Sequence, residues 1–202
     1  MDHADHFAQS VDIATTAIRG ARPDRFADPS PCSDDTVAKA TNHRAFGFLL
    51  AERSGTRMGW DPAWAGFDLV PFLVLVPFLV DVPEERWAEA AGRQAEAAAR
   101  VWADPQAREG DTDLGGSTMP AAMVGSIMTS EFVSHAWDVA AATGQSLVCP
   151  PGLGEAVVEA ASGMAQTGRD GGWFGPEVPV APSAPAFERA LGVTGRNPHR
   201  RP

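Results

Sequence analysis

The chain has 202 residues, a formal net charge of −10 at pH 7 and a hydrophobic fraction of 44%. This hydrophobic fraction is typical of globular proteins, and the length suits one domain with a sizeable core, so we expect a single domain over residues 1–202. The negative charge disfavours nucleic acids and anionic membranes as partners, because it would repel their phosphates. We therefore expect a small-molecule partner.

The N-terminal stretch MDHADHFAQS is polar and acidic, which is unlike a secretory signal peptide. The two cysteines, Cys32 and Cys149, form neither a CxxC motif nor a disulfide framework. We therefore expect a cytoplasmic protein with reduced cysteines.

The first half of the chain alternates helical and irregular patterns. Apolar residues at helical spacing predict a helix over residues 3–19, and a second helix is expected over 34–53 with Ser33 as its N-cap. A loop rich in glycine and aromatic residues follows at 54–68, and then the apolar run LVPFLVLVPFLVDVP at 69–83. Its prolines and short length exclude a membrane span. We expect it to pack on the core as a crossover, and it could also form an apolar wall of a substrate pocket.

The second half predicts further helices, with approximate bounds 84–104, 119–142, 152–167 and 185–192. Residues 105–118 are polar and glycine-rich and are expected to form a loop, and Gly144 is a suitable stop for the helix before it. Strand signals are few, so the pattern predicts an all-α bundle over about 3–168, with a long crossover between its second and third helices. The proline-rich segment 171–202 should be mostly extended.

The segment SEFVSHAWDVAAATGQ at 130–145 places Glu131 and His135 four residues apart, on one face of the predicted helix. The same face is otherwise mostly apolar and includes Val124, Ile127, Met128, Val139 and Ala142. A buried carboxylate is costly unless it is paired or bound to metal. The two residues are therefore either a hydrogen-bonded polar pair or two ligands of a metal ion. Asp138, one turn further on, could orient a ligand or act as a base.

A third ligand should come from a facing helix, because bundle metal sites use ligands that project inward from several helices. The best candidate is His43, which lies on a partly apolar face of the predicted second helix. Two imidazoles and one carboxylate suit a catalytic zinc site with open positions, and the same set can hold Fe or Ni. The alternative is that His43 is an ordinary core or rim histidine.

Three segments resemble a known family. HAWDVAAATGQ resembles the HGWDLARATGQ signature of actinobacterial proteins in the DinB-like metalloenzyme superfamily, which includes the N-terminal domain of mycothiol-dependent maleylpyruvate isomerase. SPCSDDTVAKATNH is similar to the family's TPCxxWxVRDLVNH, and FGPEVPVAPSAPAFERALGVTGRNP is similar to its C-terminal segment ending near LGRDP. The resemblance implies a four-helix bundle that binds a divalent metal, usually zinc, through His43, Glu131 and His135. It also implies mycothiol as a co-substrate.

The chain departs from the family pattern close to these residues. Asp35 stands where the family usually has tryptophan, and Thr41 and Arg44 replace apolar residues beside His43. Cys32 precedes His43 by about three helical turns, so we interpret it as structural. These departures favour a specialised substrate, which we expect to be small and apolar. The candidate pocket residues are Phe46, Trp60, Trp64, Phe72, Phe78 and Met128.

Three functions are compatible with this sequence. The first is a metal-dependent, thiol-dependent S-transferase or isomerase. The second is a metal-dependent hydrolase, lyase or rearrangement enzyme of a specialised biosynthetic pathway, and the third is a non-catalytic module that binds a metal or small ligand. If residues 69–80 were exposed, their apolar surface would favour a homodimer.

Overall fold

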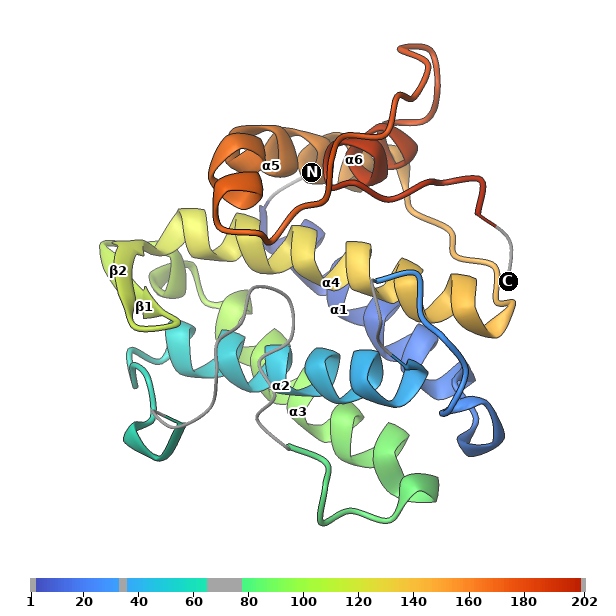
Figure 1. Ribbon diagram of the computed structural model, residues 1–202. Coiled ribbons are helices and arrows are strands. Elements are labelled where there is room, and N and C mark those ends of the chain that lie inside the picture. Colours follow the sequence, from blue (N-terminus) through green and yellow to red (C-terminus); the bar gives the residue numbers. More distant parts are fainter. Residues whose placement is uncertain (1–2, 33–35, 65–77, 201–202) are drawn as a thin grey trace.

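The computed structural model describes residues 3–32, 36–64 and 78–200, and over these residues it is mostly helical (Figure 1). The helices are α1 (His3–Gly20), α2 (Val37–Gly55), α3 (Trp87–Ala103), α4 (Ala121–Thr143), α5 (Pro151–Asp170) and α6 (Ala186–Val193). The strands are β1 (Asp111–Leu114) and β2 (Ser117–Pro120). The all-α expectation is therefore confirmed at the level of fold class, with one small hairpin added.

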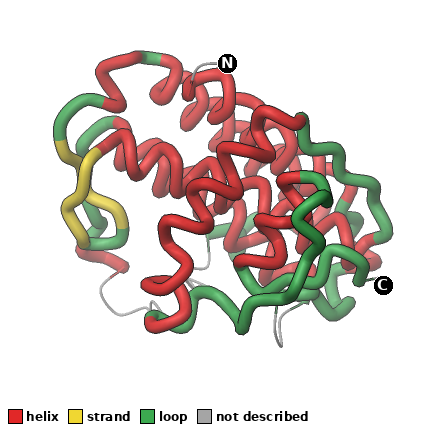
Figure 2. The backbone as a smooth tube through the Cα atoms, turned by 90° about the horizontal axis from the view of Figure 1, so that it is seen from above, coloured by secondary structure: helices red, strands yellow, loops and turns green. Residues whose placement is uncertain are grey.

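Helices α1 to α4 pack in a ring, in which α1 contacts α3 and α4, and α2 contacts the same two helices. Helices α5 and α6 pack against each other, and α5 lies on α4 (Figure 1). Figure 2 shows the hairpin at one edge of this helical body. No helix in the described ranges combines the length and the apolar character that crossing a membrane requires.

The hairpin occupies part of the segment that we predicted as a loop. Strands β1 and β2 pair antiparallel, and the turn between them uses Gly115 and Gly116, which have φ values of 62° and 83°. Consecutive positive φ values fit a tight hairpin turn, and Gly-Gly is one of its sequence signals. We missed the hairpin because its strands contain few β-branched or aromatic residues. Consequently α4 begins at Ala121, just after the predicted start.

The ends of the helices follow local chemistry. The side chain of Thr36 caps α2 by accepting a hydrogen bond from the backbone N–H of Lys39 at 3.3 Å, whereas the predicted cap Ser33 lies outside the described residues. Helix α4 ends at Thr143, and Gly144 stops it, as predicted, in the left-handed conformation with φ of 72°. Helix α5 extends three residues beyond its predicted end, to Asp170, and α6 confirms the predicted short helix near the C-terminus.

The main core lies among α1 to α4 and is organised around Trp102. This indole is 1% exposed, donates a hydrogen bond of 2.7 Å to the carbonyl of Ala51, and stacks on Phe7 with ring centroids 5.1 Å apart. A second, smaller core joins α4 to α5 and α6 through Val133, Leu153, Val157, Phe187, Ala190 and Leu191. The described end of the apolar crossover also packs on the core, because Leu79 is fully buried and its N–H donates to Asn42 at 2.8 Å. Residues 69–77 lie outside the described ranges.

Gly125 in α4 offers a test of this packing. A Cβ atom there would lie 2.7 Å from Cζ3 of Trp102, so Gly125→Ala should destabilise the fold by about 1–3 kcal/mol through overpacking. Gly163 in α5 is the matched control, because a Cβ atom there meets nothing within 4 Å. Gly163→Ala should stabilise the protein by about 0.5–1 kcal/mol, since alanine is the better helix former. Urea unfolding of both variants measures the difference, and equal effects would contradict the packing around Trp102.

Candidate metal centre

The three predicted ligands come together between α2 and α4. One ligand atom each from His43, Glu131 and His135 lies within 4.8 Å of the others. The two imidazole rings meet edge to face with centroids 4.8 Å apart. His135 is buried, whereas the Glu131 side chain keeps 36% of its surface exposed, which leaves one side of the cluster open to solvent.

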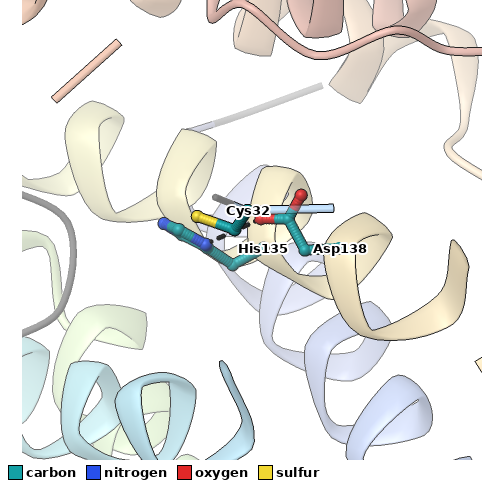
Figure 3. Close-up of side chains that lie close together, drawn as sticks. All are labelled: Cys32, His135 and Asp138. Atoms are coloured by element: carbon teal, nitrogen blue, oxygen red, sulfur yellow. Dashed lines mark ion pairs between the residues drawn. The ribbon is translucent and has the colours of Figure 1, made fainter. Parts of the chain in front are cut away.

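Both ring nitrogens of His135 contact carboxylates. Its Nε2 lies 3.1 Å from Oε2 of Glu131. Its Nδ1 lies 2.9 Å from Oδ2 of Asp138, and Figure 3 shows this second contact. Helical spacing accounts for this arrangement, because residues three and four apart share a face. Histidine ligands of metals commonly donate their second ring N–H to a carboxylate, which fixes the ring and its tautomer. Asp138 is placed to accept that bond from Nδ1.

Asp138 is itself held by an arginine from the far end of the chain. Nε and Nη2 of Arg196, just after α6, donate to the two carboxylate oxygens of Asp138 at 2.9 and 2.8 Å. Asp138 is fully buried, and Arg196 is 9% exposed. This two-pronged pairing occupies both oxygens, so of the two roles that we predicted for Asp138 the geometry favours orienting His135 over acting as a base.

The charges of this cluster shift the titration of its members. Burial raises the pKa of Glu131, but its hydrogen bond to His135 and the charges of His135 and Arg44 outweigh burial and hold the pKa at about 2. Burial and Arg44 lower the pKa of His135, but hydrogen bonds with Asp138, Cys32 and Glu131 raise it to about 10. The two carboxylates therefore favour a positive charge at the position of His135, which a proton or a metal ion can supply.

The neighbouring groups are shifted in ways that suit metal binding. Burial raises the pKa of Asp138, but the charge of Arg196 holds it well below its usual range, so this carboxylate stays ionised. Burial, together with the charge of His135, lowers the pKa of His43 well below its ordinary value. His43 is thus neutral at pH 7, which is the form that binds metals.

The donor set fits a divalent cation. Two imidazoles and one carboxylate are the ligands of many catalytic zinc sites, which leave a further position open, and iron or nickel can use the same donors. In addition, Nδ1 of His43 is buried and has no hydrogen-bond partner among the described residues. Buried polar atoms nearly always have a partner, so this nitrogen is available to an ion or to a bound molecule.

Cys32 lies closer to this site than its sequence position suggested. Its Sγ forms a second compact group with one atom each of His135 and Asp138, all within 4.8 Å (Figure 3). Three helical turns do not separate it from the site, because α2 begins only at Val37 and Pro29 pairs with Thr36 in an antiparallel β-bridge. This second group suits a metal less well, since both oxygens of Asp138 already bind a guanidinium.

The predicted pocket residues separate into two sets. Phe46 forms an aromatic cluster with Trp60 and Trp64, with the centroid of Trp64 lying 5.0 Å from both other rings. Phe78 and Met128 pack against the main core instead of joining this aromatic cluster. Phe72 lies outside the described residues.

The comparisons with known proteins identify relatives but no activity. No model of a known protein family matches the chain, and no solved structure matches it. The chain is similar to two uncharacterized proteins of Mycobacterium tuberculosis, Rv0738 and MT0763. Each is 27% identical over 187 residues, which is 92% of this chain and 89% of the relative. The similarity extends over nearly the whole chain and links it to an actinobacterial protein.

Proposed function

We propose that the protein is a divalent-metal-dependent enzyme of the DinB-like type, with zinc as the first choice of metal and His43, Glu131 and His135 as its ligands. The observation that carries the proposal is the chain of contacts from Arg196 through Asp138 to Nδ1 of His135. Such a chain leaves Nε2 facing Glu131, and it is the outer support that metal-binding histidines usually have.

The residues around the ligands have distinct roles in this proposal. Asp138 accepts a hydrogen bond from Nδ1–H of His135, which keeps the lone pair of His135 on Nε2 and fixes the ring. Arg196 neutralises Asp138 and holds it in place, because its two parallel hydrogen bonds determine both position and orientation. The partly exposed Glu131 leaves access for a small molecule. When bound, a divalent ion supplies Lewis acidity, which favours the deprotonated form of a thiol or water.

We further propose that the reaction is a thiol-dependent S-transfer or isomerisation of a small molecule, with mycothiol as the co-substrate. The support is the resemblance of the three sequence segments to the DinB-like family. The chain's own Cys149 is a poor nucleophile, because burial raises the pKa of its thiol to about 12. In this proposal the external thiol, and not Cys149, supplies the sulfur.

A second candidate is a metal-dependent hydrolase, lyase or rearrangement enzyme that uses no thiol. The observation that favours it is the polar character beside His43, where Thr41 and Arg44 are fully buried at positions that are apolar in the resembled family. The two candidates share the metal centre and differ in the group that binds to it.

Cobalt substitution distinguishes the two candidates. Cobalt-loaded protein titrated with mycothiol, or with N-acetylcysteine as a simpler thiol, should develop thiolate-to-cobalt charge-transfer absorption. The same titration on Cys32→Ser controls for the chain's own nearby thiol, and His43→Ala should give no such band. Cobalt bound without any thiol-dependent band would contradict the thiol route and favour the second candidate.

A further inference from the structure

Arg44 is a buried cation whose hydrogen bonds are not satisfied. It follows His43 on α2 and is 1% exposed, and its Nε and Nη2 are buried without a hydrogen-bond partner among the described residues. Its guanidinium lies over the ring of Phe132 at 5.5 Å, a contact that leaves the N–H groups along the edge of the guanidinium unpaired. A guanidinium stays protonated at pH 7 even when it is buried, so this side chain carries its charge.

The two unpaired atoms form one edge of the guanidinium. Arg196 uses the same edge, Nε together with Nη2, to hold both oxygens of Asp138 at 2.9 and 2.8 Å. This fork matches the spacing of the two oxygens of a carboxylate. Arg44 therefore presents, in the same core, a carboxylate-binding edge that no described acidic residue occupies.

Two hydroxyl groups, one on α2 and one on α4, also lack hydrogen-bond partners among the described residues. Thr41 is one turn before Arg44, Ser134 is one turn after Glu131, and their Oγ atoms are buried without a partner among the described residues. Three other helical threonines, Thr15, Thr129 and Thr143, instead donate to the carbonyl four residues back. Unpaired buried polar groups are rare, so their concentration on facing helices indicates that they bind something besides the protein.

The contacts of the site leave Arg44 without a paired carboxylate. Both oxygens of Asp138 accept hydrogen bonds from Arg196, and Glu131 contacts Nε2 of His135 at 3.1 Å. Neither carboxylate hydrogen-bonds Nε or Nη2 of Arg44. The charge of Arg44 therefore favours an anionic ligand at this edge.

We infer that Arg44 binds a carboxylate of a small-molecule substrate beside the candidate metal centre, with the hydroxyls of Thr41 and Ser134 as further hydrogen-bonding groups. The substrate is then a small carboxylic acid instead of a wholly apolar molecule. Its place in a reaction rests on the proposed function, whereas carboxylate binding by Arg44 does not require the metal.

The test measures carboxylate binding to the full chain after treatment with a chelator, at constant ionic strength. Acetate, pyruvate and benzoate are the probes, and acetamide and benzamide are neutral counterparts. Isothermal titration should show at least one acid binding at least tenfold more tightly than the neutral probes. Arg44→Met should lower that affinity at least tenfold. Arg44→Lys should also bind more weakly, because an ammonium group cannot form the two parallel bonds.

Thermal unfolding separates this role from a structural one. Without carboxylate, Arg44→Met should melt at the same temperature as the wild type or higher, since it removes an unpaired buried charge; a structural Arg44 predicts a lower melting temperature. Arg189→Met is the matched control, because Arg189 on α6 pairs with the exposed Glu155, and this variant should keep the carboxylate affinity.

Three results would overturn the inference: no preference for acids in the wild type, unchanged affinity in Arg44→Met, or a marked loss of stability in Arg44→Met without ligand. Zinc content measured on the same samples keeps the two proposals apart. Wild-type protein that binds carboxylate but no zinc would contradict the proposed function and leave this inference standing. If the protein binds zinc but its carboxylate affinity does not depend on Arg44, this inference is contradicted and the proposed function stands.

Discussion

His43→Ala and His135→Ala are each expected to abolish stoichiometric zinc binding, because each removes one of three protein ligands. Loss of a supporting residue around a metal typically lowers affinity by about 10–100-fold, so loss of a direct ligand should exceed that range. Competition with a chromophoric chelator measures the affinities. Glu131→Gln should weaken binding in the same way, since the amide keeps the shape of the side chain but removes the charge that draws in a cation.

His199 provides the control for these variants, since it lies in the C-terminal segment and is not among the atoms that cluster at the candidate centre. His199→Ala should bind zinc as the wild type does. Circular dichroism should show that all the variants keep their helices. Zinc affinity that is unchanged in both His43→Ala and His135→Ala would show that these residues form only a polar contact between α2 and α4.

Asp138→Ala is expected to destabilise the metal-free protein by about 3–5 kcal/mol, because it leaves the buried guanidinium of Arg196 without its carboxylate. The double variant Asp138→Ala/Arg196→Met should lose less stability than the sum of the two single variants, since no unpaired charge remains. Urea unfolding of the four proteins gives the coupling energy directly. If the stability losses of the two single variants simply add up in the double variant, Asp138 and Arg196 do not stabilise the contact between α4 and the C-terminal segment.

The exposed pair of Glu155 and Arg189 is the matched control for that cycle. Its contact distance is 3.2 Å, but the Glu155 side chain keeps 66% of its surface exposed. Glu155→Ala should change stability by only about 0–1 kcal/mol, because solvent screens an exposed ion pair. Asp138→Asn should in addition lower zinc affinity about 10–100-fold, since Asp138 supports His135. Zinc affinity that is unaffected by Asp138→Asn would exclude that supporting role.

The sequence was most informative where the helical spacing of residues determines which side chains share a face. Spacing of three and four residues placed Glu131 and His135 on one face of α4, and the ends of α1 and α4 follow from the same periodicity and from Gly144. Predicting His43 as their partner also required that a second helix face α4. His43 was the candidate because it lies on a partly apolar face of α2.

The contacts that the sequence did not predict involve chain segments without helical periodicity. Arg196 reaches Asp138 across 58 positions of sequence, and Cys32 lies near His135 in a part of the chain where Pro29 pairs with Thr36. No local pattern encodes either contact. Arg44 was recognised only as a polar substitution beside His43, whereas its meaning lies in the unpaired edge of its guanidinium, which can be identified only from the folded structure.

The most direct test of the account is the metal content of the wild-type protein. Purified protein, reconstituted with zinc and freed of excess metal by gel filtration, should contain about one zinc ion per chain by elemental analysis. Cobalt in its place should give the visible spectrum of a site with nitrogen and oxygen ligands. Protein that retains no divalent metal after reconstitution would contradict the metal centre, and His43, Glu131 and His135 would then be a buried polar cluster in a helical bundle.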